Sequence, residues 1–267
     1  VLKDMGRLDD AVVAFRTALR HNPTLAEPHN NLGGALKDLG RPEEAVAAYN
    51  AAIRAKPDYA EAYGNLGVAL CEIDNPQDGL VACVRSLEFR ETVQGKAGFV
   101  ECLSRLRLVP DAYLALAQRA LDENWSDPGK LASVVVSTLK IRLSLIGDAQ
   151  STPSTERLAG EKLLLGLMRQ APINDARLER VLTARRAALL RDLSDGPAGT
   201  GTPAATLRFM CALAAQCFVN EFVFDCGDNE LAAVDRIGRS IEAALAADAP
   251  IDETHLIVLG CYAPLHS

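Results

Sequence analysis

Side chains that can bind a peptide backbone recur at a fixed spacing near the start of the chain. Asn31 and Asn65 are thirty-four residues apart, and so are Glu27 and Glu61. A carboxamide both donates and accepts hydrogen bonds, so a row of Asn side chains can hold a chain without reading its sequence. Residues three or four apart share a helix face, which places Glu27, Asn30 and Asn31 together. These five residues form a predicted peptide-binding groove.

Other roles remain open for these amides. Asn31 and Asn65 can be solvated, or they can bond one repeat to the next. A charged clamp for the C-terminal carboxylate of a partner would need Lys and Arg on the same faces. We do not expect the repeated segments to supply them.

A second polar group lies in an apolar helix predicted at 204–224. Gln216, Asn220 and Glu221 fall close along one side of that helix. We expect them to form a small buried network or to dock on a partner domain. A catalytic carboxylate is a weaker interpretation, because Glu221 has no His near it in the sequence and a Glu without a partner in a defined role is weak evidence of a catalytic site.

The spacing of thirty-four residues extends to the apolar positions. Gly33 and Gly67 are one period apart, as are Leu32 and Leu66. Such a period, with small residues at fixed places, indicates stacked helix–turn–helix units. One unit is predicted to hold helices at 25–38 and 42–55, joined by a turn in which Gly40 ends one helix and Pro42 begins the next.

The period ends near residue 91, although helical patterns continue. We predict an all-α chain in which a helical hairpin solenoid at 1–91 precedes a degenerate repeat and helical region at 92–198 and a C-terminal helical region at 199–267. The first repeat is incomplete and the last helix stops in apolar sequence, so we expect a fragment of a longer protein. Beyond residue 91 the expected helices are 93–107, 111–123, 131–146, 155–170, 175–193, 204–224, 229–247 and 253–265.

Composition and charge are those of a soluble, cytoplasmic helical protein. The hydrophobic fraction is 49% and the aromatic fraction 5%. No apolar run reaches the roughly 18 residues that cross a bilayer, so no membrane association is expected. The net charge of −7 divides into −4, +3 and −6 over the three regions. No basic stripe predicts nucleic-acid binding.

Motifs for catalysis, cofactors and metals are missing from the sequence. The seven Cys are odd in number and widely spaced, without the paired C-x2-C of a zinc site, so we expect reduced, buried thiols. No phosphate loop or G-x-G-x-x-G turn is present, and the Gly-rich stretch at 199–203 is predicted to be a linker. We therefore expect no catalytic, metal-binding or cofactor-binding residue.

The repeats resemble the tetratricopeptide repeat family. The resemblance lies in AEPHNNLGGALKDLGRPEEA at 26–45 and AEAYGNLGVAL at 60–70. It implies that the first helix of each unit lines a concave groove for peptides. The spaced Asn residues look like the asparagine ladder of the repeats attached to O-linked N-acetylglucosamine transferases.

The second half resembles large bacterial proteins that join such repeats to a class I S-adenosylmethionine-dependent methyltransferase domain. The similar segments are ALDENWSDPGKL at 120–131, LAAQCFVNEFVF at 213–224 and LGCYAPLH at 259–266. The resemblance implies a covalently linked catalytic domain outside this sequence, which would hold the S-adenosylmethionine.

These observations leave three hypotheses for the function of the chain. The leading hypothesis is a protein- or peptide-binding scaffold, the recognition part of a larger methyltransferase. The second is a regulatory helical domain that docks on the methyltransferase domain through 204–224 and binds no substrate. The third is an enzyme in its own right, which S-adenosylmethionine binding by this chain would support.

Overall fold

The structure is a computed structural model of the 267-residue chain. It describes every residue except 1–6, 146–151, 196–202, 220–227, 248–250 and 263–267. The described residues form fourteen α-helices and one short 3-10 helix, and no strand occurs among them. The predicted all-α class is confirmed.

The chain divides into two compact units. The first contains residues 1–109 and 124–134, and the second contains residues 110–123 and 135–267. The predicted domain boundaries at 91 and 198 remain predictions. The helices of the first unit are α1 (Leu8–His21), α2 (Ala26–Asp38), α3 (Pro42–Ala55), α4 (Ala60–Glu72), α5 (Pro76–Phe89) and α6 (Val93–Ser104).

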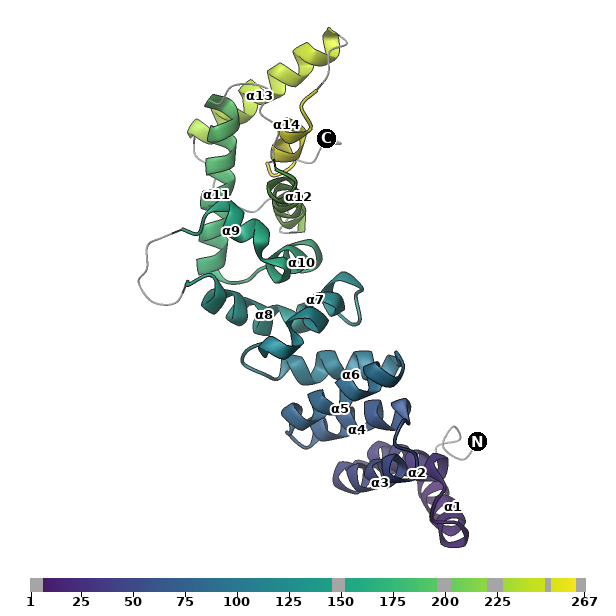
Figure 1. The fold of residues 1–267 in the computed structure, drawn as a ribbon. Coiled ribbons are helices and arrows are strands. Elements are labelled where there is room, and N and C mark those ends of the chain that lie inside the picture. The colour runs from purple at the N-terminus through teal and green to yellow at the C-terminus, as the bar shows by residue number, and fades with distance from the viewer. Residues whose placement is uncertain (1–6, 146–151, 196–202, 220–227, 248–250, 263–267) are drawn as a thin grey trace. The chain divides into compact units, whose positions relative to one another are not determined.

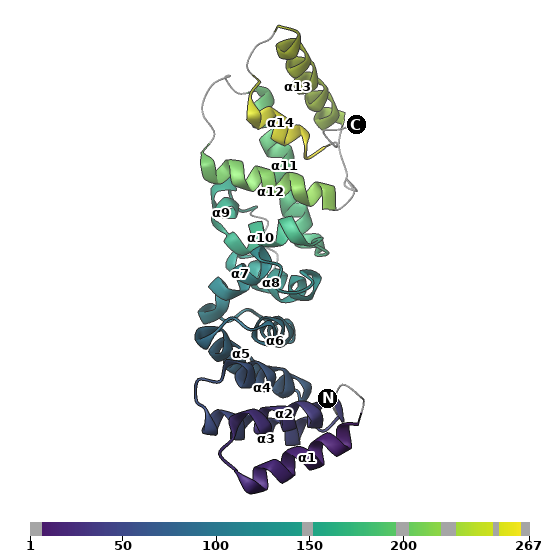
Figure 2. The same ribbon diagram turned by 90° about the vertical axis from the view of Figure 1, so that its right-hand side faces the viewer.

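Successive helices of the first unit pack as neighbours, in chain order from α1 to α6 (Figures 1 and 2). The first helices of consecutive hairpins also contact one another, α2 with α4 and α4 with α6. This pairing forms a helical solenoid. The five predicted groove residues lie on two of these first helices, α2 and α4.

The turns within the hairpins repeat one backbone conformation. Gly40 has a φ of 72°, and Asp74, one period later, has a φ of 61°. This left-handed region suits Gly and is tolerated by Asp. Pro42 and Pro76 then begin α3 and α5, where a missing N–H costs no helical hydrogen bond. The predicted turn at Gly40 and Pro42 is confirmed.

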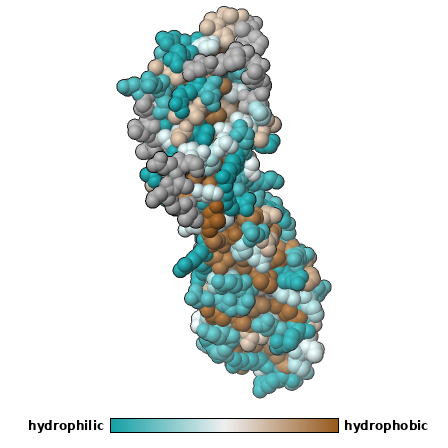
Figure 3. Space-filling view, turned by 60° about the vertical axis from the view of Figure 1, so that its left-hand side comes forward, coloured by the Kyte–Doolittle hydropathy of each residue, from teal (hydrophilic) through white to brown (hydrophobic). Residues whose placement is uncertain are grey.

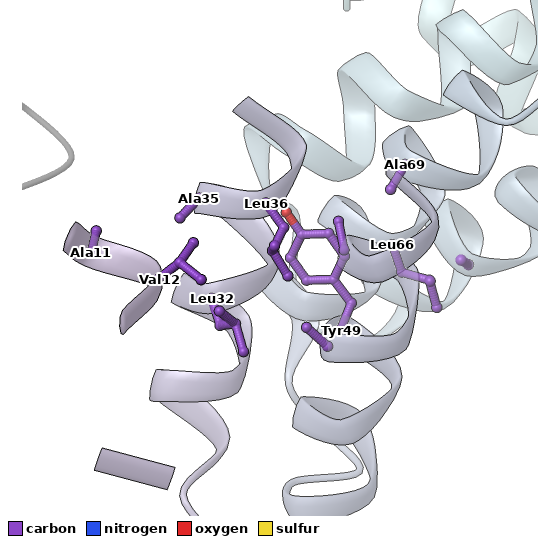
Figure 4. Packing of buried hydrophobic residues seen from close by; sticks show 11 residues of the cluster. Ala11, Val12, Leu32, Ala35, Leu36, Tyr49, Leu66 and Ala69 are labelled. Atoms are coloured by element: carbon purple, nitrogen blue, oxygen red, sulfur yellow. The ribbon is translucent and has the colours of Figure 1, made fainter. Parts of the chain in front are cut away.

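Tyr49 of α3 lies at the centre of the hydrophobic core of the first unit. Its ring lies between Leu36 of α2 and Leu66 of α4 (Figure 4). Only 1% of Tyr49 is exposed. A Cβ on Gly33 would come within 2.6 Å of the ring, so a side chain at position 33 would displace it. Gly33 thus allows the core to hold an aromatic ring between two helices.

One period later, Gly67 makes the same kind of close approach with a smaller partner. A Cβ on Gly67 would overlap the sulfur of Cys83 and lie 2.8 Å from the carbonyl oxygen of Gly79. The backbones of α4 and α5 therefore touch. Cys83 occupies the place of Tyr49 one period later. Its side chain is smaller than the Tyr ring, so α4 and α5 meet at their backbones, whereas the ring of Tyr49 fills the space beside Gly33.

The second unit is a less regular helical assembly. Its elements are a 3-10 turn (Asp111–Tyr113), α7 (Leu114–Asp122), α9 (Thr155–Gly160), α10 (Lys162–Gln170), α11 (Ala176–Asp195), α12 (Ala204–Val219), α13 (Asp228–Ala246) and α14 (Glu253–Leu259). Helix α8 (Gly129–Arg142) has residues in both units. Helix α10 packs on α7 and α12, α12 also contacts α9 and α14, and α11 contacts α13.

The single helix predicted at 155–170 is wrong. The chain leaves helical geometry at Glu161, which has a φ of −88° and a ψ of 93°, and so separates α9 from α10. Gly160 precedes this break and lowers the helical preference there. The Glu161 carboxylate accepts a hydrogen bond of 2.9 Å from Nε of Arg142, which holds the bend.

Large apolar side chains remain partly exposed on the first unit, among them Val13, Val81 and Val93. In the face that Figure 3 presents, hydrophobic residues lie between hydrophilic ones. Scattered apolar exposure of this kind is ordinary on protein surfaces. Of the described helices, none is both long enough and apolar enough to cross a membrane.

The contact at Gly67 generates a stability prediction. We expect Gly67→Ala to lower the free energy of unfolding by about 2 kcal/mol, because the added Cβ overlaps Cys83 and meets backbone. Urea denaturation followed by circular dichroism measures the change.

Gly238 of α13 supplies the matched control. A Cβ there would meet no atom within 4 Å. Gly238→Ala should therefore raise the free energy of unfolding by about 0.5–1 kcal/mol, because Ala has the higher helix propensity. Equal effects of the two substitutions would contradict the proposed close contact.

Candidate peptide-binding site

A hollow of ≈ 540 Å³ opens on the face formed by α2, α4 and α6. Three of the five predicted groove residues line it: Asn30, Asn31 and Asn65. The remaining lining comes from α1, α2, α3, α4 and α6, namely Phe15, Gly34, Lys37, Asp38, Tyr49, Val68 and Gln94. The hollow is therefore lined by every helix from α1 to α6 except α5.

A hydrogen bond joins two of the predicted amides. The Nδ2 of Asn65 donates to Oδ1 of Asn30 over 3.0 Å, between α4 and α2. This bond between repeats was one of the open alternatives for Asn65. It uses one donor of Asn65 and one acceptor position of Asn30, whereas each carboxamide has two N–H donors and an oxygen with two lone pairs. The pair therefore has a fixed orientation at the surface of the hollow.

The apolar part of the lining comes from the core. Phe15 and Val68 are half-buried and Tyr49 is almost fully buried. Phe15 and Tyr49 are one repeat apart, so α1 and α3 bring the same kind of side chain to this face. Because these rings also pack in the core, they form a rigid floor under the amides.

The one cation in the lining is already paired. Lys37 Nζ lies 3.3 Å from Oδ1 of Asp38 and 3.9 Å from Oε1 of Glu72. Burial raises the pKa of Tyr49, and the charges of Asp38 and Glu72 raise it further. The expectation that these faces lack Lys is wrong for Lys37, but its pairing leaves no free positive charge for a carboxylate clamp.

Buried hydroxyl groups fix the start of α6, which carries Gln94. Ser86 Oγ donates to the carbonyl oxygen of Ala60 over 2.7 Å and lies 2.8 Å from Oγ1 of Thr92. Thr92 Oγ1 accepts from the backbone N–H of Gly95 over 2.9 Å. Since the proton of Ser86 is used on Ala60, the Thr92 hydroxyl donates to Ser86. This chain of bonds ties α4, α5 and α6 together where Gln94 meets the hollow.

The two predicted glutamates lie outside the lining of the hollow. Glu61 forms an ion pair with Arg90. Glu27 is exposed. The pKa of Tyr59 is raised first by the burial of Tyr59 itself and then by the charge of Glu27. Both carboxylates are nevertheless on the same helices as the amides. Their role as groove residues remains a prediction.

Sequence reasoning did not select Lys37, Asp38 or Gln94. Helical spacing could have found the first two, because they lie seven residues after Asn30 and Asn31 and so return to the same face. Gln94 carries no such signal. Its counterpart one period earlier is Ala60, and only the packing of α6 on α4 brings it to the hollow.

The predicted docking helix is described only in part. Gln216 of α12 is 3% exposed, and Asn220 and Glu221 lie outside the described residues. Cys211, also on α12, is exposed, so the expectation of buried thiols is wrong for this residue. Among the residues that the structure describes, no cluster of three or more His, Cys, Asp or Glu could hold a metal ion.

The Asn30–Asn65 bond generates a second prediction. In a double-mutant cycle, Asn30→Ala and Asn65→Ala should show a coupling energy of about 1 kcal/mol, the net value of a partly buried hydrogen bond. Urea denaturation measures the four free energies of unfolding. A parallel cycle of Asn31→Ala with Asn65→Ala is the control and should show weaker coupling. Equal coupling in both cycles would refute a specific bond.

Comparison with known proteins agrees with the repeat geometry. Residues 1–40 and 33–73 match the family described as TPR repeat. No curated protein matches the chain. The matched residues contain α1 to α4, with the period, the paired helices and the whole lining of the hollow except Gln94. The chain thus begins with tetratricopeptide repeats, in an all-α helical solenoid.

Proposed function

We propose that the first unit binds an extended segment of a protein partner, whose backbone is held by the amides of the hollow. Tetratricopeptide repeats generally mediate protein–protein interaction, which supports the class of partner. The observation that carries the proposal is the convergence of Asn30, Asn31, Asn65 and Gln94 on one hollow. Four carboxamides offer donors and acceptors that match a peptide backbone.

The charges around the hollow disfavour an anionic ligand group. Lys37 is neutralised by Asp38 and Glu72, so a partner carboxylate gains little attraction there. Backbone amides carry no charge and match the lining better. The partner is therefore selected mainly by its extended shape and by apolar side chains that reach Phe15 and Val68.

The typical free energies of hydrogen bonds and of apolar burial indicate how much each contributes to the affinity. Each backbone hydrogen bond contributes about 0.5–1.5 kcal/mol, so a few of them alone give weak binding. Burial of apolar side chains adds roughly 25 cal/mol per Å². The amides thus set the register and direction of the bound segment, while apolar contacts supply much of the free energy.

A displayed library of random peptides, selected on the wild-type chain, provides ligands for the test. We expect Asn31→Ala combined with Asn65→Ala to weaken binding of the selected peptides roughly tenfold, from the loss of two hydrogen-bonding groups. Fluorescence anisotropy measures the affinity, and far-UV circular dichroism verifies that helicity is intact.

Asn50→Ala on α3 is the matched control, because Asn50 lies outside the lining of the hollow. The Asn50→Ala variant should bind the peptides with the affinity of the wild type. Methylation of single backbone nitrogens in a selected peptide should also weaken binding. Unchanged affinity of the double variant would exclude the amide row as the binding site.

We also propose that the repeats serve a methyltransferase domain joined to this chain, either by presenting its protein substrate or through docking of 204–224. This proposal is supported by the resemblance of residues 120–131, 213–224 and 259–266 to the middle region of large bacterial proteins that join such repeats to a methyltransferase domain.

The S-adenosylmethionine site is expected in that further domain, because this sequence lacks a Gly-rich strand–turn–helix. Calorimetric titration of this chain with S-adenosylmethionine should therefore give no binding heat. Micromolar binding would instead favour the hypothesis of an enzyme within these residues.

A further inference from the structure

Two carboxylates form an acidic edge beside the hollow. Asp38 is the last residue of α2 and lines the hollow, and Glu72 is the last residue of α4, one period later. Lys37 Nζ lies 3.3 Å from Oδ1 of Asp38 and 3.9 Å from Oε1 of Glu72. One ammonium therefore faces two carboxylates, which leaves one negative charge in excess within this group of three side chains.

The backbone adds to the negative charge of this acidic edge. The C-terminal end of a helix carries roughly half a negative charge, because its last C=O groups lack N–H partners. Acidic residues are unfavourable there, and the last turn of α4 contains no basic residue. The charges of Asp38 and Glu72 also raise the pKa of Tyr49, after the larger effect of burial. Tyr49 lines the hollow, so this shift agrees with a negative potential there.

The next hairpin shows which group the chain itself places at such a helix end. Arg105 directly follows α6, and its Nη1 donates to the carbonyl oxygen of Cys71 over 3.0 Å, in the last turn of α4. Residues 71 and 105 are one period apart. A guanidinium from the following hairpin thus lies at the C-terminal end of α4, where the helix dipole favours a cation.

At the end of α2, the residue in the place of Arg105 is Cys71. Its side chain is 1% exposed, and burial raises the pKa of the thiol to about 12, so it is uncharged at neutral pH. The carbonyl group that corresponds to that of Cys71 belongs to Lys37, which lines the hollow beside Asp38. The repeat therefore supplies a cation from the following hairpin to the end of α4, and a neutral thiol to the end of α2.

We propose that the hollow selects a protein segment with a Lys or Arg side chain, which binds at the acidic edge against Asp38 and Glu72. This inference rests on the proposed function, because the amides hold the backbone of the same segment. The cation of the partner offsets the excess negative charge, and it takes at the end of α2 the position that Arg105 takes at the end of α4. A carboxylate of the partner is repelled there.

Solvent exposure limits the size of this effect. The side chains of Asp38 and Glu72 are 30% and 40% exposed, so water and salt screen their charges. Ion pairs of this kind change an affinity by only a few-fold. The basic side chain thus determines which segments are preferred and in which register they bind, while the amides and the apolar contacts supply most of the affinity.

The peptides selected from the displayed library provide the first test. We expect Lys or Arg to be enriched at one position of the aligned peptides over the unselected library. A peptide with Lys at this position is then compared with an analogue that has norleucine there, which keeps the methylene stem and removes the charge. Fluorescence anisotropy with the wild-type chain should show roughly fivefold weaker binding of the analogue. The difference should shrink at high salt.

Variants of the chain test where the charge is recognised. Asp38→Asn combined with Glu72→Gln should bind the Lys and norleucine peptides equally. Lys37→Met removes the competing ammonium and should strengthen binding of the Lys peptide. Asp9→Asn combined with Glu43→Gln is the matched control, because it changes the net charge equally at exposed positions of α1 and α3 outside the lining of the hollow. This control should keep the fivefold difference.

The outcomes separate this inference from the proposed function. Selected peptides without enriched Lys or Arg, equal affinities of the two peptides for the wild type, or a difference that persists in the Asp38 and Glu72 variant would overturn the basic-residue preference alone. The amide site stands in these cases if the Asn31 and Asn65 variant still loses affinity. Absence of peptide binding, or unchanged binding by that Asn variant, would overturn the proposed function and this inference with it.

Discussion

The close approach of paired helices at Gly33 and Gly67 is the contact on which the repeat array depends. Where position 33 lacks a side chain, the ring of Tyr49 enters the space between α2, α3 and α4. Where position 67 lacks one, α4 meets the backbone of α5. Both contacts occur at the same place in successive hairpins. The step from one hairpin to the next is therefore determined inside the core, and the outer face follows from it.

That step brings the amides together. Asn30 and Asn65 are thirty-five residues apart in the chain, and they can share a hydrogen bond only because α2 and α4 pack side by side. The Ser86 and Thr92 hydroxyls add α6 to the same row and thereby bring Gln94 to the hollow. A polar surface on a solenoid is thus a product of core packing, since each hairpin contributes only part of it.

Periodicity is what made the first unit predictable. The positions of Gly33, Gly40 and Pro42 predict the helix pair and its turn, and the Asn spacing predicts which face carries the amides. The bond partner of Asn65 was not predictable, because Asn30 and Asn31 differ by 100° around an ideal helix and both face that side. The break at Glu161 was also missed, since a continuous apolar pattern favours one helix and the contact of Glu161 with Arg142, nineteen residues earlier, is not visible in the sequence.

The thiols show why residue type alone predicts little about chemistry. Cys83 replaces an aromatic residue at a packing position, and its surroundings are helix backbones and other thiols. Cys217 is also buried, but the pKa of its thiol is lowered by a hydrogen bond with Cys261 and then by the charge of Arg186, against the effect of burial. The neighbours of a buried thiol, and not its burial alone, therefore set the direction in which its pKa shifts. Arg186 is distant from Cys217 in the sequence, so this difference follows from the fold and not from the local sequence.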